Sequence, residues 1–246
     1  MEFVPSEVRS SRPRRIFGII ALTVALIAQL ALYAALAPFA VPIGLAVVNT
    51  LPGPGGPPTP IPSADRSAGG PGSLVSATTM PGVTRRVEAR NMHAARVLYR
   101  STSGDSGEST VVSGSVFTPL GAPPPGGWRV VAIGHGTVGI DEPCAPSLSD
   151  TMLGALAFVT PFIDRGYAVA VPDYQGLGAK GIHPYLDAKT AGLNMIDSVR
   201  ALRHTFADVS GTWMAFGHSQ GGAATWAADE QAAVYAPELQ LLGAVA

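Results

Sequence analysis

The pentapeptide Gly217-His218-Ser219-Gln220-Gly221 constrains the fold more than any other stretch of the chain. Glycines two residues to either side of a serine are needed where a strand turns abruptly into a helix, because a Cβ there would collide with the turn. Residues 212–216 before it form a short apolar run typical of a buried strand, and the small residues from 222 onward favour a helix. The pattern predicts a strand, a tight turn and a helix, with the hydroxyl of Ser219 projecting above the sheet from a strained backbone.

Further strands and helices alternate along the C-terminal part of the chain. Alternating apolar residues predict strands at 94–99 and 111–118 that suit an antiparallel pair. Apolar runs predict further strands at 128–133, 166–171 and 241–246, and helical periodicity predicts helices at 153–165 and 188–206. We therefore expect an α/β fold with a mostly parallel sheet and helices on both faces. Functional residues of such sheets lie at the carboxyl ends of strands, which is where residues 134–137, Asp173 and Ser219 fall.

The N-terminal third has a different composition. Four arginines within residues 1–15 precede the uncharged run 16–37, which is long enough to cross a bilayer of ~30 Å. We expect a basic cytoplasmic segment at 1–15, a transmembrane helix or signal anchor at 16–37, and the remainder outside the cytoplasm. A removed signal peptide, and thus a secreted protein, is the alternative. Residues 38–72 are first apolar and then rich in Pro and Gly, which predicts a linker to a domain at 73–246.

Composition excludes several classes of function. A net charge of -1, without a basic stripe, argues against nucleic acid as a partner. The one cysteine, Cys144, excludes an internal disulfide and a multi-cysteine zinc site within this chain. No metal and no cofactor are expected.

The motif at the turn fits acyl-transfer chemistry, which needs a nucleophile, donors for a developing oxyanion, a histidine base and an orienting acid. Ser219 is the candidate nucleophile, with Gly217 and Gly221 as the glycines of its turn. The backbone N–H of Gln220 is the first candidate oxyanion donor, and that of Thr137, in the turn after the strand at 128–133, is the second.

Several segments together resemble the secretory lipases, which are serine hydrolases with an α/β-hydrolase fold. The similar segments are His135-Gly136-Thr137-Val138-Gly139, Cys144-Ala145-Pro146-Ser147, Pro172-Asp173-Tyr174-Gln175-Gly176-Leu177-Gly178, His183-Pro184-Tyr185-Leu186 and Gly217-His218-Ser219-Gln220-Gly221-Gly222. The resemblance covers about residues 73–246. It implies lipase or esterase action on acyl esters, such as triacylglycerol or related lipids, with Ser219 as nucleophile.

The chain departs from that family pattern after the serine. In α/β-hydrolases the acid and the histidine follow the nucleophile, each after a later strand, yet no histidine follows Ser219 here. We therefore expect an N-terminal part of a lipase, truncated after the helix that follows Ser219, with the triad acid and histidine absent from this chain. The five histidines present are better explained as structural residues than as the base: His93, His135, His183, His204 and His218. A non-catalytic, membrane-anchored binding module with a hydrolase-like fold stays open as a second hypothesis.

Overall fold

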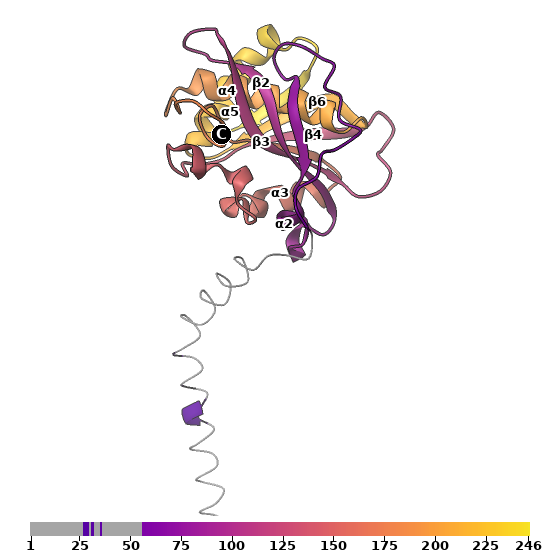
Figure 1. Cartoon of the computed structure of the whole chain (residues 1–246), viewed down its shortest axis with the longest axis vertical. Coiled ribbons are helices and arrows are strands. Elements are labelled where there is room, and N and C mark those ends of the chain that lie inside the picture. The colour runs from indigo at the N-terminus through magenta and orange to yellow at the C-terminus, as the bar shows by residue number, and fades with distance from the viewer. Residues whose placement is uncertain (1–26, 30, 32–34, 36–55) are drawn as a thin grey trace, which may run out of the picture. The chain divides into compact units, whose positions relative to one another are not determined.

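The computed structural model describes residues 27–29, 31, 35 and 56–246 (Figure 1). Residues 27–29, 31 and 35 are helical, and the rest of the expected membrane segment 16–37 lies outside the described residues. A transmembrane helix needs about 20 consecutive residues, and every helix in the described part of the chain falls short of the length and apolarity required. The fold prediction that included a transmembrane helix is corrected accordingly: the described fold is α/β with a mixed sheet.

From residue 56 onward the chain forms a twisted sheet and the helices that pack on it (Figure 1). Its strands are β1 (Leu74–Thr79), β2 (Met92–Thr102), β3 (Ser109–Pro119), β4 (Trp128–Gly134), β5 (Ala168–Pro172), β6 (Val209–Gly217) and β7 (Gln240–Val245). Its α-helices are α2 (Pro81–Thr84), α3 (Leu156–Ile163), α4 (Ala188–Thr205) and α5 (Gln220–Tyr235). Four 3-10 turns complete it: η1 (Val87–Ala89), η2 (Glu142–Cys144), η3 (Pro146–Leu148) and η4 (Met152–Gly154).

The sheet is mixed and not mostly parallel as expected. Its strand order is β1-β2-β3-β5-β4-β6-β7. The pairs β1–β2, β2–β3 and β3–β5 are antiparallel, whereas β5–β4, β4–β6 and β6–β7 are parallel. The antiparallel pair expected from the alternating runs is β2–β3, and the sequence pattern did not reveal that β3 continues into the parallel half by pairing with β5. The strand expected at 241–246 is β7, which follows α5 and pairs with β6.

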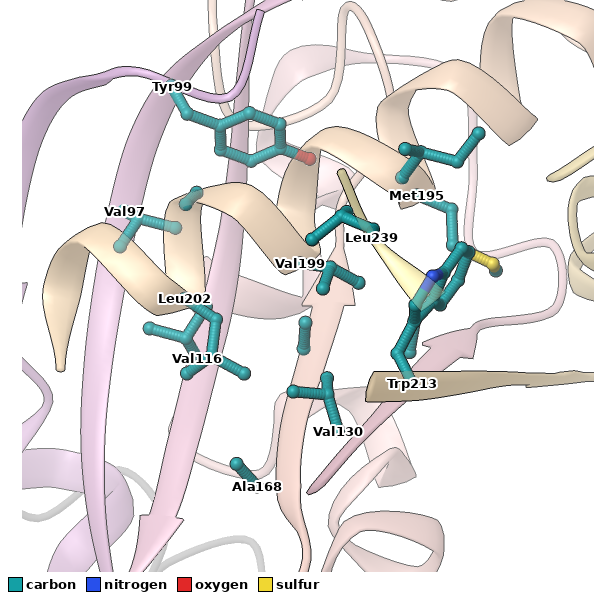
Figure 2. Packing of buried hydrophobic residues seen from close by; sticks show 14 of the residues in the cluster. Val97, Tyr99, Val116, Val130, Ala168, Met195, Val199, Leu202, Trp213 and Leu239 are labelled. Carbon is teal, nitrogen blue, oxygen red and sulfur yellow. The ribbon is translucent and has the colours of Figure 1, made fainter. Parts of the chain in front are cut away.

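Helices cover both faces of the sheet, as the strand pattern predicted. Successive residues of a strand point to opposite faces, so Val130 and Ala132 of β4 face one core while Val131 and Ile133 face the other. The first core lies under α4 and α5, and Figure 2 shows side chains of α4 packed against strand residues of this core. The second core lies under α3. Burial of both faces explains why the central strands are nearly uninterrupted apolar runs.

The helix expected at 153–165 is shorter than predicted, because α3 begins only at Leu156. Met152, Leu153 and Gly154 have φ angles of 51°, 49° and 92°. A left-handed backbone cannot continue a right-handed helix, so these three residues form the separate turn η4. The helix expected at 188–206 is α4, which Asp187 caps by accepting a hydrogen bond of 3.2 Å from the Thr190 N–H.

The compact unit that contains the sheet runs from Pro52 to Ala246. The end of the segment expected as a linker contacts the sheet, since the N–H of Ile61 donates to the Ala77 carbonyl and the N–H of Thr79 donates to the Thr59 carbonyl. Ordered contacts thus begin before residue 73. The domain boundaries predicted at 15, 37 and 72 stay predictions.

Candidate active site

The turn between β6 and α5 carries Ser219 in an uncommon backbone conformation. β6 ends at Gly217, α5 begins at Gln220, and Ser219 at the helix N-cap has φ 56° and ψ -125°. A positive φ is rare for a non-glycine residue. Ser219 is solvent-exposed although the residues on both sides of the turn are buried. The strand, turn and helix predicted around this serine are therefore present.

Two glycines allow this turn to approach the neighbouring strand. Gly134 at the end of β4 is paired with Gly217 at the end of β6. A Cβ on Gly217 would overlap the Gly221 carbonyl oxygen, and a Cβ on Gly221 would overlap the Gly134 carbonyl oxygen. The backbones of β4, β6 and α5 consequently meet at a spacing that no larger residue permits.

The turn at residues 217–221 between β6 and α5 is called the elbow below. The loop after β4 lies beside this elbow and is held by buried groups. The His135 ring places Nδ1 at 2.7 Å from the Gly136 carbonyl and Nε2 at 3.3 Å from the Asp173 carbonyl. The hydroxyl of Tyr174 donates to the His135 carbonyl at 3.2 Å. Burial lowers the pKa of His135, which favours the neutral imidazole, and a neutral ring donates to only one of these two carbonyls. His135 thus fixes the loop that carries Thr137.

The side chain of Thr137 points toward the loop after β5, where its Oγ1 lies 3.1 Å from the hydroxyl of Tyr185. The ring of His218, next to the candidate nucleophile, lies over Gly136, since a Cβ on Gly136 would be 3.0 Å from His218 Nε2. The turn that carries Ser219 and Gln220 and the loop that carries Thr137 are therefore neighbours.

Asp173, at the carboxyl end of β5, acts as a structural centre of these loops. The Ser113 hydroxyl donates to Oδ2 at 2.5 Å and the Ser147 N–H donates to Oδ1 at 2.9 Å. Burial raises the pKa of the carboxyl group. Sequence reasoning placed Asp173 at the functional edge but missed Ser113 and Ser147, because nothing in their spacing marks them as partners.

A second contact that sequence reasoning missed joins the elbow to the loop after β5. The side-chain amide of Gln220 donates to Nε2 of His183 at 3.0 Å, and Nδ1 of His183 lies 2.9 Å from the Gln175 carbonyl. A neutral imidazole with its proton on Nδ1 satisfies both bonds. Gln220 and His183 are 7% and 8% exposed, so the pair lies in the interior, and Gln220 directly follows Ser219 in the chain.

Chemically, this arrangement offers an exposed hydroxyl at the N-terminus of a long helix. The first N–H groups of a helix have no partner within it, and the helix dipole favours negative charge there. Within the described residues, no group of three or more His, Cys, Asp or Glu side chains is placed to hold a metal ion.

An α/β sheet with a serine on a strand-to-helix elbow is the architecture of the α/β-hydrolase lipases and esterases. Candida antarctica lipase A in its closed state has this fold, with a TM-score of 0.57 and 20% identity over 78% of this chain and 46% of that one. The rice cell wall degrading esterase LipA from Xanthomonas oryzae gives a TM-score of 0.55 and 25% identity over 70% of this chain and 49% of that one.

The more specific match is to the secretory lipases, whose family model matches residues 148–246. This match confirms the resemblance found in the sequence. A probable trichothecene esterase from Stachybotrys chartarum is 27% identical over 191 residues, which are 71% of this chain and 38% of that protein. The chain is thus related to lipases and esterases, and it spans less than half the length of these relatives.

Proposed function

We propose that the protein is a serine carboxylic-ester hydrolase whose nucleophile is Ser219. The observation that carries the proposal is the φ of 56° at this exposed serine. Such a conformation costs on the order of 1–3 kcal/mol, and strained residues cluster at active sites because the surrounding structure must hold them there. Gly217, Gly134 and Gly221 supply that support, since no Cβ fits at any of the three.

Two backbone N–H groups serve as the oxyanion hole in this proposal. The Gln220 N–H is at the start of α5, where the helix dipole adds to its attraction for negative charge. The Thr137 N–H lies on the loop held by His135 and Tyr174. Preorganised donors of this kind are usually the largest single contribution to catalysis of acyl transfer.

None of the five histidines serves as the base in this proposal. His135 and His183 bind backbone carbonyls in the interior, His204 lies 3.6 Å from Asp65, and the His93 ring lies beside Phe206. His218 neighbours Ser219, but its ring contacts Gly136 and Phe158. A serine hydroxyl without an adjacent base is a weak nucleophile, so we expect the 246-residue chain to hydrolyse esters slowly.

Acyl esters, including those of lipids, are the proposed substrates, and the secretory family points to action outside the cytoplasm. The matched relatives are lipases and esterases, which supports an ester as the substrate. Their names do not specify the acyl or the alcohol part of that ester. The alternative of a hydrolase-like binding module without catalysis is an outcome of the test below.

The test uses a fluorophosphonate that labels activated serines, with imidazole added as an external base. Imidazole can take the place of a missing general base, whose contribution is typically 10²–10⁴-fold. We expect labelling at Ser219, located by mass spectrometry, to accelerate on the order of tenfold or more with imidazole, and p-nitrophenyl butyrate hydrolysis to follow.

The two controls are Ser219→Ala, which should abolish the imidazole-dependent signal, and Ser210→Ala at the opposite end of β6, which should preserve it. Equal labelling of all three proteins would contradict the nucleophile assignment and favour the binding module. Fast hydrolysis without imidazole that vanishes in Ser219→Ala would show that one of the five histidines is the base after all.

A further inference from the structure

A chain of hydrogen bonds runs from the elbow to the middle of α4. It begins with the bond from the Gln220 amide to Nε2 of His183 and continues from Nδ1 of His183 to the Gln175 carbonyl. The N–H of Gln175 then donates to Oδ1 of Asn194 at 2.9 Å. Asn194 is fully buried on α4. The loop after β5 is therefore held between the start of α5 and the middle of α4.

Asn194 continues this chain to an ion pair on α4. Its Nδ2 donates to the Ser101 hydroxyl of β2 at 2.9 Å, and that hydroxyl donates to Oδ2 of Asp197 at 2.7 Å. Tyr235 of α5 donates to the same carboxylate oxygen at 2.8 Å, and Arg200 donates to the other one at 2.7 Å. Ser101 and Asn194 are 1% and 0% exposed, so bulk water does not replace a bond that is lost here.

The backbone of Gln175 fixes the direction of these bonds. Its carbonyl can only accept, so His183 carries a proton on Nδ1, and the neutral ring then accepts from the Gln220 amide at Nε2. Its N–H can only donate, so Oδ1 of Asn194 accepts and Nδ2 is left to donate to the β2 hydroxyl. Every donor thus points away from the elbow and toward the carboxylate on α4. Hydrogen bonds aligned in this way polarise and strengthen one another.

We propose that Asn194 is a positioning residue of the active site, which fixes the start of α5 through the Gln175 backbone and His183. The proposal rests on the ester hydrolase function proposed above, because the candidate oxyanion donor is the Gln220 N–H at that helix start. Such a donor contributes to catalysis when it is preorganised where the oxyanion forms. Asn194 is fully buried and acts only through its neighbours.

The tautomer of His183 tests the proposal without requiring turnover. NMR of the histidine ring nitrogens in the 246-residue chain should show His183 protonated on Nδ1 and unprotonated on Nε2. Asn194→Leu has a side chain of similar size and removes both bonds of the amide. We expect this variant to populate both tautomers of His183, because the backbone of Gln175 is no longer held by α4.

Three further variants separate positioning from a general loss of stability. Ser198→Ala is the matched control, because the Ser198 hydroxyl is buried on α4 but donates to the Met195 carbonyl of the same helix. It should leave the His183 tautomer unchanged. Asn194→Asp keeps an acceptor for the Gln175 N–H and should restore most of the parent tautomer.

Ser101→Ala is the milder change, which removes only the acceptor of the Asn194 Nδ2 group, and it should populate the second tautomer to a smaller extent. It keeps the proposal testable if Asn194→Leu does not fold. An unchanged His183 tautomer in both variants, or an equal change in Ser198→Ala, would overturn the proposal.

Labelling of Ser219 by the fluorophosphonate in the presence of imidazole separates this proposal from the enzyme assignment. We expect Asn194→Leu to slow labelling on the order of tenfold, less than the 10²-fold cost of losing a donor, because the Gln220 N–H is displaced and not removed. Asn194→Asp should recover most of that rate. Labelling that slows equally in Ser198→Ala would show a merely structural role and overturn the proposal. A tautomer change in Asn194→Leu with no labelling of Ser219 in the parent would support the positioning of α5 and count against the catalytic function.

Discussion

The side-chain amide of Gln220 donates a hydrogen bond of 3.0 Å to Nε2 of His183, which joins the residue after the candidate nucleophile to the loop after β5. Both side chains are buried, and the Oε1 atom of Gln220 has no hydrogen-bond partner among the described residues. The His183 bond is therefore the contact that orients this amide. The same bond holds the start of α5 against the loop after β5.

Removing that partner should destabilise the fold measurably. We expect His183→Ala to lower the free energy of unfolding by about 1–3 kcal/mol, because a buried amide donor is left unsatisfied. Urea denaturation measures the change, and Ile182→Ala, at an 86% exposed neighbour, should stay within about 0.5 kcal/mol. Adding Gln220→Met to His183→Ala should recover part of the loss. Without recovery, the cost comes from the lost imidazole packing and not from the amide.

Two adjacent glycines at the start of α5 should respond in opposite directions to alanine. Gly221→Ala forces a Cβ into the Gly134 carbonyl, and we expect it to cost more than about 2 kcal/mol of stability. Gly222→Ala meets no atom nearer than 3.7 Å and should stabilise the helix by about 0.5–1 kcal/mol. Thermal unfolding of both variants measures this. Similar effects at both positions would contradict the close approach of β4 and α5.

Gly136→Val should slow the reaction of Ser219 with a fluorophosphonate by on the order of 10²-fold, the usual cost of one oxyanion donor. A Cβ at this position meets Nε2 of His218 at 3.0 Å, so the ring has to move. The double variant Gly136→Val/His218→Ala removes that collision. If Thr137 is the donor, the loss should persist in the double variant. Full recovery would assign the effect to His218 and remove Thr137 from the oxyanion hole.

The contribution of Asp197 to the stability of the fold should fall between about pH 4 and pH 6. Burial raises the pKa of this carboxyl group from 3.8 to about 6, despite its 2.7 Å ion pair with Arg200 and its hydrogen bonds from Ser101 and Tyr235. The folded state thus binds the proton of Asp197 more tightly than the unfolded state, so the contribution of this group to stability is fully present below about pH 4 and is lost as the pH rises through 6. A pKa change of this size corresponds to about 3 kcal/mol.

Asp197→Asn should remove that part of the pH dependence, since the amide cannot ionise. His135 contributes with the opposite sign, because burial lowers its pKa, and Asp173 contributes with the same sign. The difference between the parent and Asp197→Asn in urea unfolding from pH 4 to 8 isolates Asp197. Parallel curves would contradict the raised pKa.

The elbow was predictable because its requirements are local. A strand, a serine between two glycines and a helix all fall within one short segment, and Gly217 and Gly221 are needed for reasons that apply to any such turn. β2 and β3 were also predictable, because an alternation of apolar and polar residues is typical of a strand with one buried face. These features depend on neighbours in the sequence.

The unpredicted features depend on partners far along the chain. The bond between His183 and Gln220 spans 37 residues, and the antiparallel pairing of β3 with β5 joins segments separated by the whole of β4 and α3. Of the three residues of η4, only Gly154 is of a type that favours a left-handed backbone. Met152 and Leu153 give no such signal in the sequence. The transmembrane prediction for 16–37 rested on the length and apolarity of this run and on the arginines before it, and the described helices do not support it.

The pairing of residues 59–61 with β1 determines where the domain bears mechanical load. Pro60 forms an antiparallel bridge to Thr78, and hydrogen bonds at Thr59 and Ile61 flank it. The Asp65 N–H also donates to the His204 carbonyl at the end of α4. Tension applied to the chain ahead of residue 56 is therefore taken up at the β1 edge of the sheet. Four strands separate that edge from β6, so the turn that carries Ser219 is shielded from a pull at the N-terminal side.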